Sequence, residues 1–155
     1  MRVACLWSGG KDSAYACYLA LSMGLKVDRL ITFYPQDPES KLFHALNIKW
    51  TALQAESMGI HHDIVEAPRD QEYEVLRTTL MQIKEHHKIE GVVAGVIASS
   101  YQRRIIQEAC DDAKLRLITP LWGQDPFRLI RQMINENFKA IVVGVYAEGL
   151  TQQWL

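Results

Sequence analysis

The chain has 155 residues, of which 48% are hydrophobic and 23% charged, and its formal net charge is −1. This composition is typical of one soluble globular domain with a substantial core. A net charge near zero gives no general attraction to nucleic acid or to an anionic membrane, and no apolar run is long enough to span a bilayer. The three cysteines, Cys5, Cys17 and Cys110, form no C-x-x-C pair. Their odd number argues against a disulfide framework and predicts a reducing, cytoplasmic compartment.

Strand-like and helix-like segments alternate along the whole chain. The strand-like segments are apolar runs at residues 3–7, 27–33, 63–66, 91–96, 115–119 and 140–145. The helix-like segments lie between them, at residues 13–23, 41–58, 71–87, 103–113 and 126–135. Regular alternation of this kind predicts an α/β fold, with an open, mostly parallel, doubly wound sheet of about five to six strands and helices on both faces.

The first strand and the first helix are joined by a glycine turn, Ser8-Gly9-Gly10-Lys11-Asp12-Ser13. A strand that turns through glycines into a helix presents free backbone N–H groups and the positive end of the helix dipole, which together attract phosphate. Gly9 and Gly10 lack a Cβ, so a phosphate oxygen can approach the backbone closely. Ser8 and Ser13 add hydroxyl donors, and Lys11 adds a positive charge. We therefore predict that this turn binds phosphate; a plain glycine turn with polar neighbours is the alternative.

Asp12 is unusual in a phosphate-binding turn, because its carboxylate repels an anion. We expect it to act indirectly, by holding a Mg²⁺ ion that bridges to the phosphates. The turn is not a Walker A loop. That motif needs a glycine where this chain has Cys5, and a serine or threonine where it has Asp12.

The second strand ends in a proline-containing loop near residues 34–38. Ligands in open α/β sheets bind beyond the carboxyl ends of the strands, so we expect Thr32 and Phe33 to flank an adenine there. For Phe33, a place in the core is an equal alternative. The helix predicted at residues 41–58 carries His44 and has apolar positions spaced by four, four and three, at Leu42, Leu46, Trp50 and Leu53.

Two adjacent arginines follow the fourth strand. That strand is apolar without alternation, which suits a parallel strand covered on both faces. Arg103 and Arg104 fall in the first turn of the next helix, where a cation opposes the helix dipole. Their position predicts that at least one of them faces an anion, and a solvated surface pair is the alternative.

The turn at residues 8–13 resembles the pyrophosphate loop (PP-loop) of the N-type ATP pyrophosphatases. Later motifs extend the resemblance over the whole chain, to the diphthine–ammonia ligase family of PP-loop enzymes. They are His44, Gln54-Ala55-Glu56, Met58-Gly59-Ile60, Gly95, Ser100-Tyr101-Gln102-Arg103 and Pro120-Leu121-Trp122. The resemblance implies an adenine nucleotide α-hydrolase-like, Rossmann-like fold. It also implies that ATP is cleaved to AMP and pyrophosphate, that a diphthine carboxylate on translation elongation factor two is adenylated, and that ammonia then forms the amide.

The resemblance and the residue types together imply a set of site residues. The expected catalytic residues are Lys11, Asp12 and Arg103, of which Arg103 could hold the α-phosphate or the substrate carboxylate bidentately. The expected nucleotide-binding residues are Ser8, Gly9, Gly10, Lys11, Asp12, Ser13, Thr32, Phe33 and Gly95. Residues expected near the second substrate are His44, Ser100, Tyr101 and Gln102. The expected cofactors are ATP and Mg²⁺, the latter held through Asp12; the expected partners are ATP or AMP, ammonia and elongation factor two, and a homo-oligomeric state is compatible with the sequence.

Three other functions are alternatives. A tRNA-modifying PP-loop enzyme would need cysteines near the site and a basic face for RNA, whereas Cys17 and Cys110 fall inside helices. A non-catalytic nucleotide-binding protein of the universal-stress type would not need Asp12 and Ser13 after the glycines. A metal enzyme is suggested by the pairs His61-His62 and His86-His87, but adjacent residues on a strand or helix point apart.

Members of the resembled family continue beyond the position of Trp154 and Leu155, into a glycine- and glutamate-rich motif and a further subdomain. Residues 1–155 are therefore interpreted as a single PP-loop ATP-binding domain that lacks the family's C-terminal subdomain. ATP binding is expected in either case, whereas amide ligation depends on whether the natural chain is longer.

Overall fold

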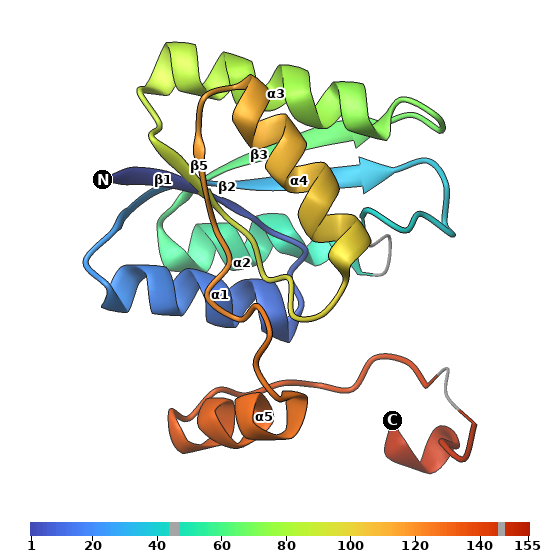
Figure 1. The fold of residues 1–155 in the computed structure, drawn as a ribbon. Helices are drawn as coiled ribbons and strands as arrows, with labels where there is room; N and C mark the ends of the chain where they lie inside the picture. The colour runs from blue at the N-terminus through green and yellow to red at the C-terminus, as the bar shows by residue number, and fades with distance from the viewer. Residues whose placement is uncertain (44–46, 146–147) are drawn as a thin grey trace. The chain divides into compact units, whose positions relative to one another are not determined.

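The computed structural model describes residues 1–43, 47–145 and 148–155 (Figure 1). These residues form two compact units, Met1–Gln124 and Asp125–Leu155. The organisation of the whole chain as one domain stays a prediction.

The first unit contains a parallel sheet of five strands. They are β1 (Arg2–Leu6), β2 (Lys26–Pro35), β3 (His61–Ala67), β4 (Gly91–Val93) and β5 (Arg116–Ile118). The strands lie in the order β3-β2-β1-β4-β5, and every neighbouring pair is parallel. The chain therefore builds outward from β1 in one direction through β3, and then resumes on the other side of β1 with β4. This reversal places the switch point of the sheet beside β1, as the sequence predicted.

Helices cover both faces of this sheet (Figure 1). α1 (Lys11–Ser22) and α2 (Thr51–Met58) lie on one face, and α3 (Glu72–His87) and α4 (Ser100–Asp112) lie on the other. The main core lies between the sheet and α3 and α4, and its buried members include Ala4, Ile31, Phe33, Leu76, Leu80, Ile83, Val92, Ala94, Ile106 and Ala109. The predicted fold class, a doubly wound α/β sheet, is confirmed.

The helix predicted at residues 41–58 is shorter than the apolar spacing indicated. A 3₁₀ turn, η1 (Ile48–Trp50), leads into α2, which begins only at Thr51. Upstream, the hydroxyl of Ser40 accepts hydrogen bonds from the backbone N–H groups of Leu42 (3.2 Å) and Phe43 (3.0 Å). Asn47 has a left-handed backbone with φ of 60°. A serine side chain that binds nearby N–H groups competes with helix formation, and a left-handed residue interrupts a right-handed helix.

The second unit contains α5 (Pro126–Asn135) and a 3₁₀ turn, η2 (Gln152–Trp154). The predicted start of α5 is confirmed, because the Asp125 carboxylate accepts from the Arg128 N–H at 2.8 Å and proline occupies the first turn. The strand predicted at residues 140–145 is wrong: these residues carry no regular secondary structure. An apolar run becomes a strand only where a neighbouring strand pairs with it. Among the residues that the structure describes, no helix has the length and apolar character needed to cross a membrane.

The segment after β4 runs against the start of α1 at one glycine. A Cβ built on Gly95 would lie 2.7 Å from the carbonyl carbon and oxygen of Asp12, and 2.8 Å from the backbone nitrogen of Ser13. These are backbone atoms, which cannot swing aside as a side chain can. Gly95 therefore lets β4 approach the first turn of α1 closely enough for the two to share one site.

We predict that Gly95→Ala destabilises the protein by about 1–3 kcal/mol, the usual cost of overpacking, because the added methyl group would push on the first turn of α1. The measurement is the free energy of unfolding in guanidinium chloride. Gly10→Ala is the matched control: Gly10 has a φ of −81°, and an added Cβ would meet only Ser8 Oγ, at 3.4 Å. Its loss should stay below about 1 kcal/mol. Equal stability of Gly95→Ala and the wild type would contradict the assignment.

Candidate functional site

The turn between β1 and α1 is held by two serine hydroxyls. Ser13 Oγ donates to the carbonyl oxygen of Gly10 (3.0 Å), accepts from the backbone N–H of Ser8 (3.3 Å), and lies 3.1 Å from Ser8 Oγ. Gly9 has a left-handed backbone with φ of 74°. Gly10 stands at the start of α1, where no side chain caps the helix. The first N–H groups of α1 are thus left free of a capping side chain, as a phosphate-binding turn requires.

Lys11 and Asp12 form an ion pair in the first turn of α1. Lys11 Nζ lies 2.9 Å from both carboxylate oxygens of Asp12, and the two side chains are 43% and 33% exposed. Exposed pairs of this kind are weak, so both groups are free to exchange partners. They place one cation and one oxygen donor beside the glycine turn.

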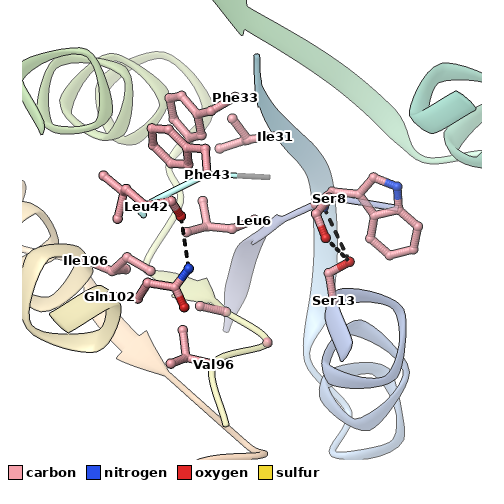
Figure 2. Close-up of a pocket in the computed structure, with 13 residues that line it drawn as sticks. Leu6, Ser8, Ser13, Ile31, Phe33, Leu42, Phe43, Val96, Gln102 and Ile106 are labelled. Atoms are coloured by element: carbon pink, nitrogen blue, oxygen red, sulfur yellow. Dashed lines mark hydrogen bonds between the residues drawn. The ribbon is translucent and has the colours of Figure 1, made fainter. Parts of the chain in front are cut away.

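A cavity opens next to this turn, beyond the carboxyl ends of β1, β2 and β4. The space is about 590 Å³ when its open mouth is included. Figure 2 shows the hydroxyls of Ser8 and Ser13 on one side of the cavity, with Phe33, Phe43, Leu42 and Ile106 on the opposite side. The cavity thus has a polar wall at the helix N-terminus and an apolar wall facing it.

The apolar wall is completed by a segment that the sequence analysis had assigned to a helix. Phe43 stacks on Phe33, with ring centroids 4.5 Å apart and planes 13° apart. Gln102, on α4, donates from Nε2 to the carbonyl oxygen of Leu42 at 3.2 Å (Figure 2). Leu42 and Phe43 were missed as site residues, because the spacing of residues 41–58 assigned Leu42 to the apolar stripe of a helix and gave Phe43 no role.

The cavity brings together five of the residues predicted from the sequence. They are Ser8, Ser13, Phe33, Gly95 and Gln102. Gly9, Gly10, Lys11 and Asp12 complete the turn beside it but do not line it. Their roles toward a ligand stay predictions.

Thr32 does not line the cavity. Its hydroxyl donates to the carbonyl oxygen of Trp7 at 2.7 Å, and its oxygen lies 2.8 Å from Nε2 of His62. Thr32 is 1% exposed. Successive residues of a strand point to opposite faces, so Phe33 faces the cavity while Thr32 joins β2 and β3 to the end of β1.

The two arginines at the start of α4 differ in their surroundings. Arg104 is exposed, pairs with Glu108 at 3.0 Å and lies over the ring of Tyr101. The guanidinium of Arg103 lies 4.9 Å from the ring centroid of Trp122, and its Nε is buried with no hydrogen-bond partner among the described residues. Arg103 does not line the cavity; of the two adjacent arginines, it is the one with a buried Nε that lacks a partner among the described residues.

The other predicted substrate residues are Ser100, Tyr101 and His44. Ser100 and Tyr101 form the first turn of α4, which Ser99 caps by accepting from the N–H of Gln102 at 3.3 Å. Tyr101 is 46% exposed. His44 lies outside the described residues.

Gln54, on α2, is a further residue at the site that the sequence pattern did not indicate. Its Nε2 donates to the carbonyl oxygen of Gly9 at 3.1 Å, and its Oε1 accepts from the indole N–H of Trp7 at 3.1 Å. The only signal in the sequence was its place in the motif Gln54-Ala55-Glu56, which carries no information on contacts.

All three cysteines are buried. Burial raises the pKa of the Cys110 thiol to about 12. The pKa of the Cys5 thiol is raised by its hydrogen bond with Cys17 and by burial. In the part of the chain that the structure describes, no three His, Cys, Asp or Glu side chains are grouped to hold a metal ion.

Comparison with known proteins agrees with this geometry. Residues 1–117 match the family model of the diphthamide synthase N-terminal domain. The chain is 32% identical to a diphthine–ammonia ligase of Mus musculus and 31% identical to one of Danio rerio, over 97% of its own length. It spans 64% and 66% of those two proteins, which is less than two thirds of each.

A solved structure shares the fold at low sequence identity. It is a U34-tRNA thiolase, NcsA from Methanococcus maripaludis with its 4Fe–4S cluster, and it matches with a TM-score of 0.55 and 15% identity. The match covers 90% of this chain and 58% of the thiolase. This likeness confirms the predicted PP-loop fold, and the family match over residues 1–117 confirms the resemblance found in the sequence. The chain belongs to the diphthamide synthase N-terminal domain family.

Proposed function

We propose that this protein binds ATP with Mg²⁺ and cleaves it to AMP and pyrophosphate, activating a carboxylate that ammonia then converts to an amide. The observation that carries the proposal is the uncapped glycine turn of residues 8–13, which opens directly onto a cavity with an apolar wall. A nucleotide has the same division, with charged phosphates at one end and a flat base at the other. The acceptor we propose is diphthine on elongation factor two, because the similar proteins of mouse and zebrafish are named diphthine–ammonia ligases.

The turn and the cavity support separate tasks. The N–H groups of α1, with Ser8 and Ser13, would hold the β- and γ-phosphates, and the wall at Phe33 and Phe43 would contact the base. Negative charge grows on pyrophosphate as the α–β bond breaks, and fixed donors and the Lys11 ammonium stabilise charge of that kind. The nucleophile comes from the substrate carboxylate, so no activated side chain is needed.

Asp12 has the character expected of an indirect Mg²⁺ ligand. Its carboxylate is one-third exposed and pairs with the Lys11 side chain. Mg²⁺ prefers oxygen donors of this kind and is typically bound by one or two carboxylates together with substrate phosphates. When bound with ATP, Mg²⁺ would offset the charge of the phosphates.

A tRNA-thiolating reaction is the second candidate, since the solved structure with the same fold is a tRNA thiolase. Thiolation by cysteine needs an accessible thiolate. Cys5, Cys17 and Cys110 are buried, and the pKa of Cys110 is raised to about 12. The burial of the thiols therefore favours the ligase.

We expect that incubation with MgATP, ammonium and elongation factor two carrying diphthine releases AMP and pyrophosphate in equal amounts. The measurement is chromatography of the nucleotides, with mass spectrometry of the acceptor. Gly10→Val should lose the activity, because a branched side chain would occupy the place where phosphate approaches the backbone. Formation of ADP and phosphate would move the protein to another reaction class.

Asp12→Asn should weaken the Mg²⁺-dependent part of ATP binding by roughly 10- to 100-fold, the usual effect of losing a metal-supporting carboxylate, and leave AMP binding nearly unchanged. Calorimetric titration with ATP, with and without Mg²⁺, measures both. The control is Asp111→Asn, which removes an exposed carboxylate on α4 that accepts a hydrogen bond from Gln107. Equal losses with and without Mg²⁺ would show that Asp12 does not act through the metal.

Arg103→Lys should lower the rate of AMP release by roughly 30- to 1000-fold, while ATP affinity changes little. Lysine keeps the charge but loses the paired donors that suit a phosphate or carboxylate, and a contact made mainly in the transition state affects turnover rather than binding. Arg104→Lys, whose guanidinium pairs with Glu108 at the surface, should keep wild-type turnover. A loss confined to ATP affinity would make Arg103 a nucleotide-anchoring residue instead.

A further inference from the structure

One side chain of α2 bonds to both ends of the bend that leads into the turn. Gln54 Oε1 accepts from the indole Nε1 of Trp7 at 3.1 Å, and Gln54 Nε2 donates to the carbonyl oxygen of Gly9 at 3.1 Å. Trp7 is the residue after β1 and is 5% exposed. Gly9 is the left-handed residue of the turn, with φ of 74°. Gln54 thus spans the bend from the strand end to the first glycine.

The chemistry of the two partners requires an amide at this position. The indole N–H can only donate, and the Gly9 carbonyl can only accept. A glutamine side chain supplies one acceptor and one donor, so it satisfies both. A carboxylate could serve Trp7 but would repel the Gly9 carbonyl, and an apolar side chain would leave the buried indole N–H unpaired.

Steric contact reinforces the two hydrogen bonds. A Cβ on Gly9 would lie 2.6 Å from Gln54 Oε1 and 3.1 Å from Cγ2 of Thr51. Thr51 is fully buried, and its hydroxyl donates to the Ile48 carbonyl oxygen at 2.6 Å. The start of α2 therefore packs so closely against the turn that Gly9 has no room for a side chain.

We propose that Gln54 is a positioning residue for the phosphate site: it holds Gly9 in its left-handed conformation and so directs the free N–H groups of α1 toward the β- and γ-phosphates. This inference rests on the proposed function, because it assigns the purpose of the contact to nucleotide binding. It differs from a mere packing contact in requiring both the donor and the acceptor of the amide.

The test compares Gln54→Met, which keeps the length of the side chain without its hydrogen bonds, with Gln54→Glu. Calorimetry with ATP, AMP and Mg²⁺ measures affinity relative to the wild type at each pH. Gln54→Met should bind ATP roughly 5- to 100-fold more weakly at every pH, the effect of one buried donor left unpaired. The loss should be smaller for AMP, which lacks the phosphates that the turn is proposed to hold.

Gln54→Glu provides a readout that a packing role would not move. At pH 8 the introduced carboxylate repels the Gly9 carbonyl, so ATP affinity should be low. As pH falls toward the pKa of that carboxyl, which burial and the facing carbonyl raise above the usual glutamate value of about 4.3, the protonated group can donate to Gly9 and still accept from Trp7. Affinity relative to the wild type should then recover. In the NMR spectrum of Gln54→Met, the indole N–H resonance of Trp7 should shift, because methionine lacks the oxygen that accepts this hydrogen bond.

Gln107→Met is the matched control, since Gln107 lies on α4 and its side chain donates to Asp111 there; the ATP affinity of this variant should equal that of the wild type. Wild-type affinity in both Gln54 variants, or a loss in Gln54→Glu that does not depend on pH, would overturn the positioning role and leave the proposed function standing. Absence of ATP binding by the wild-type protein would overturn both. If Gln54→Met fails to fold, the pH dependence of ATP affinity in Gln54→Glu still decides the question.

Discussion

The backbone of the turn between β1 and α1 is held from three directions, and the rest of the first unit is arranged around this constraint. The β1 end is paired to β2 through the Trp7 N–H and the Ile31 carbonyl, at 2.8 Å. The amide of Gln54 fixes the bend from the side of α2, and Gly95 brings the segment after β4 against the helix backbone. A phosphate site built from main-chain N–H groups depends on such support, because a free N–H group is useful only when its direction is fixed.

The reversal of strand order explains why polar and apolar walls meet at this point. β2 and β4 pair with opposite edges of β1. The connections that follow these two strands therefore diverge, and a crevice remains at the carboxyl end of β1. The helix that follows β1 covers one face of the sheet, and α4 covers the other. The polar N-terminus of α1 faces side chains that belong to the core beneath α3 and α4, such as Phe33 and Ile106.

The sequence predicted the turn, the alternation of elements and the switch point correctly, because each depends on local pattern and on the handedness of the chain. It failed where apolar spacing did not decide the outcome. The helix at residues 41–58 is interrupted by the Ser40 hydroxyl and by left-handed Asn47, and neither effect alters apolar spacing. Thr32 and Phe33 were both assigned to the base, although alternation along a strand allows only one of them to face the cavity. Gln54 could not be found from pattern, since its partners lie about fifty residues upstream in the chain.

The stack of Phe33 on Phe43 sets the orientation of the apolar wall before any ligand arrives. The ring faces that meet in the stack are already covered, so a ligand can contact only the ring surfaces that line the cavity. Aromatic rings prefer offset or edge-to-face contacts. A wall whose rings are already oriented would therefore select among flat ligands by shape more than by apolar area.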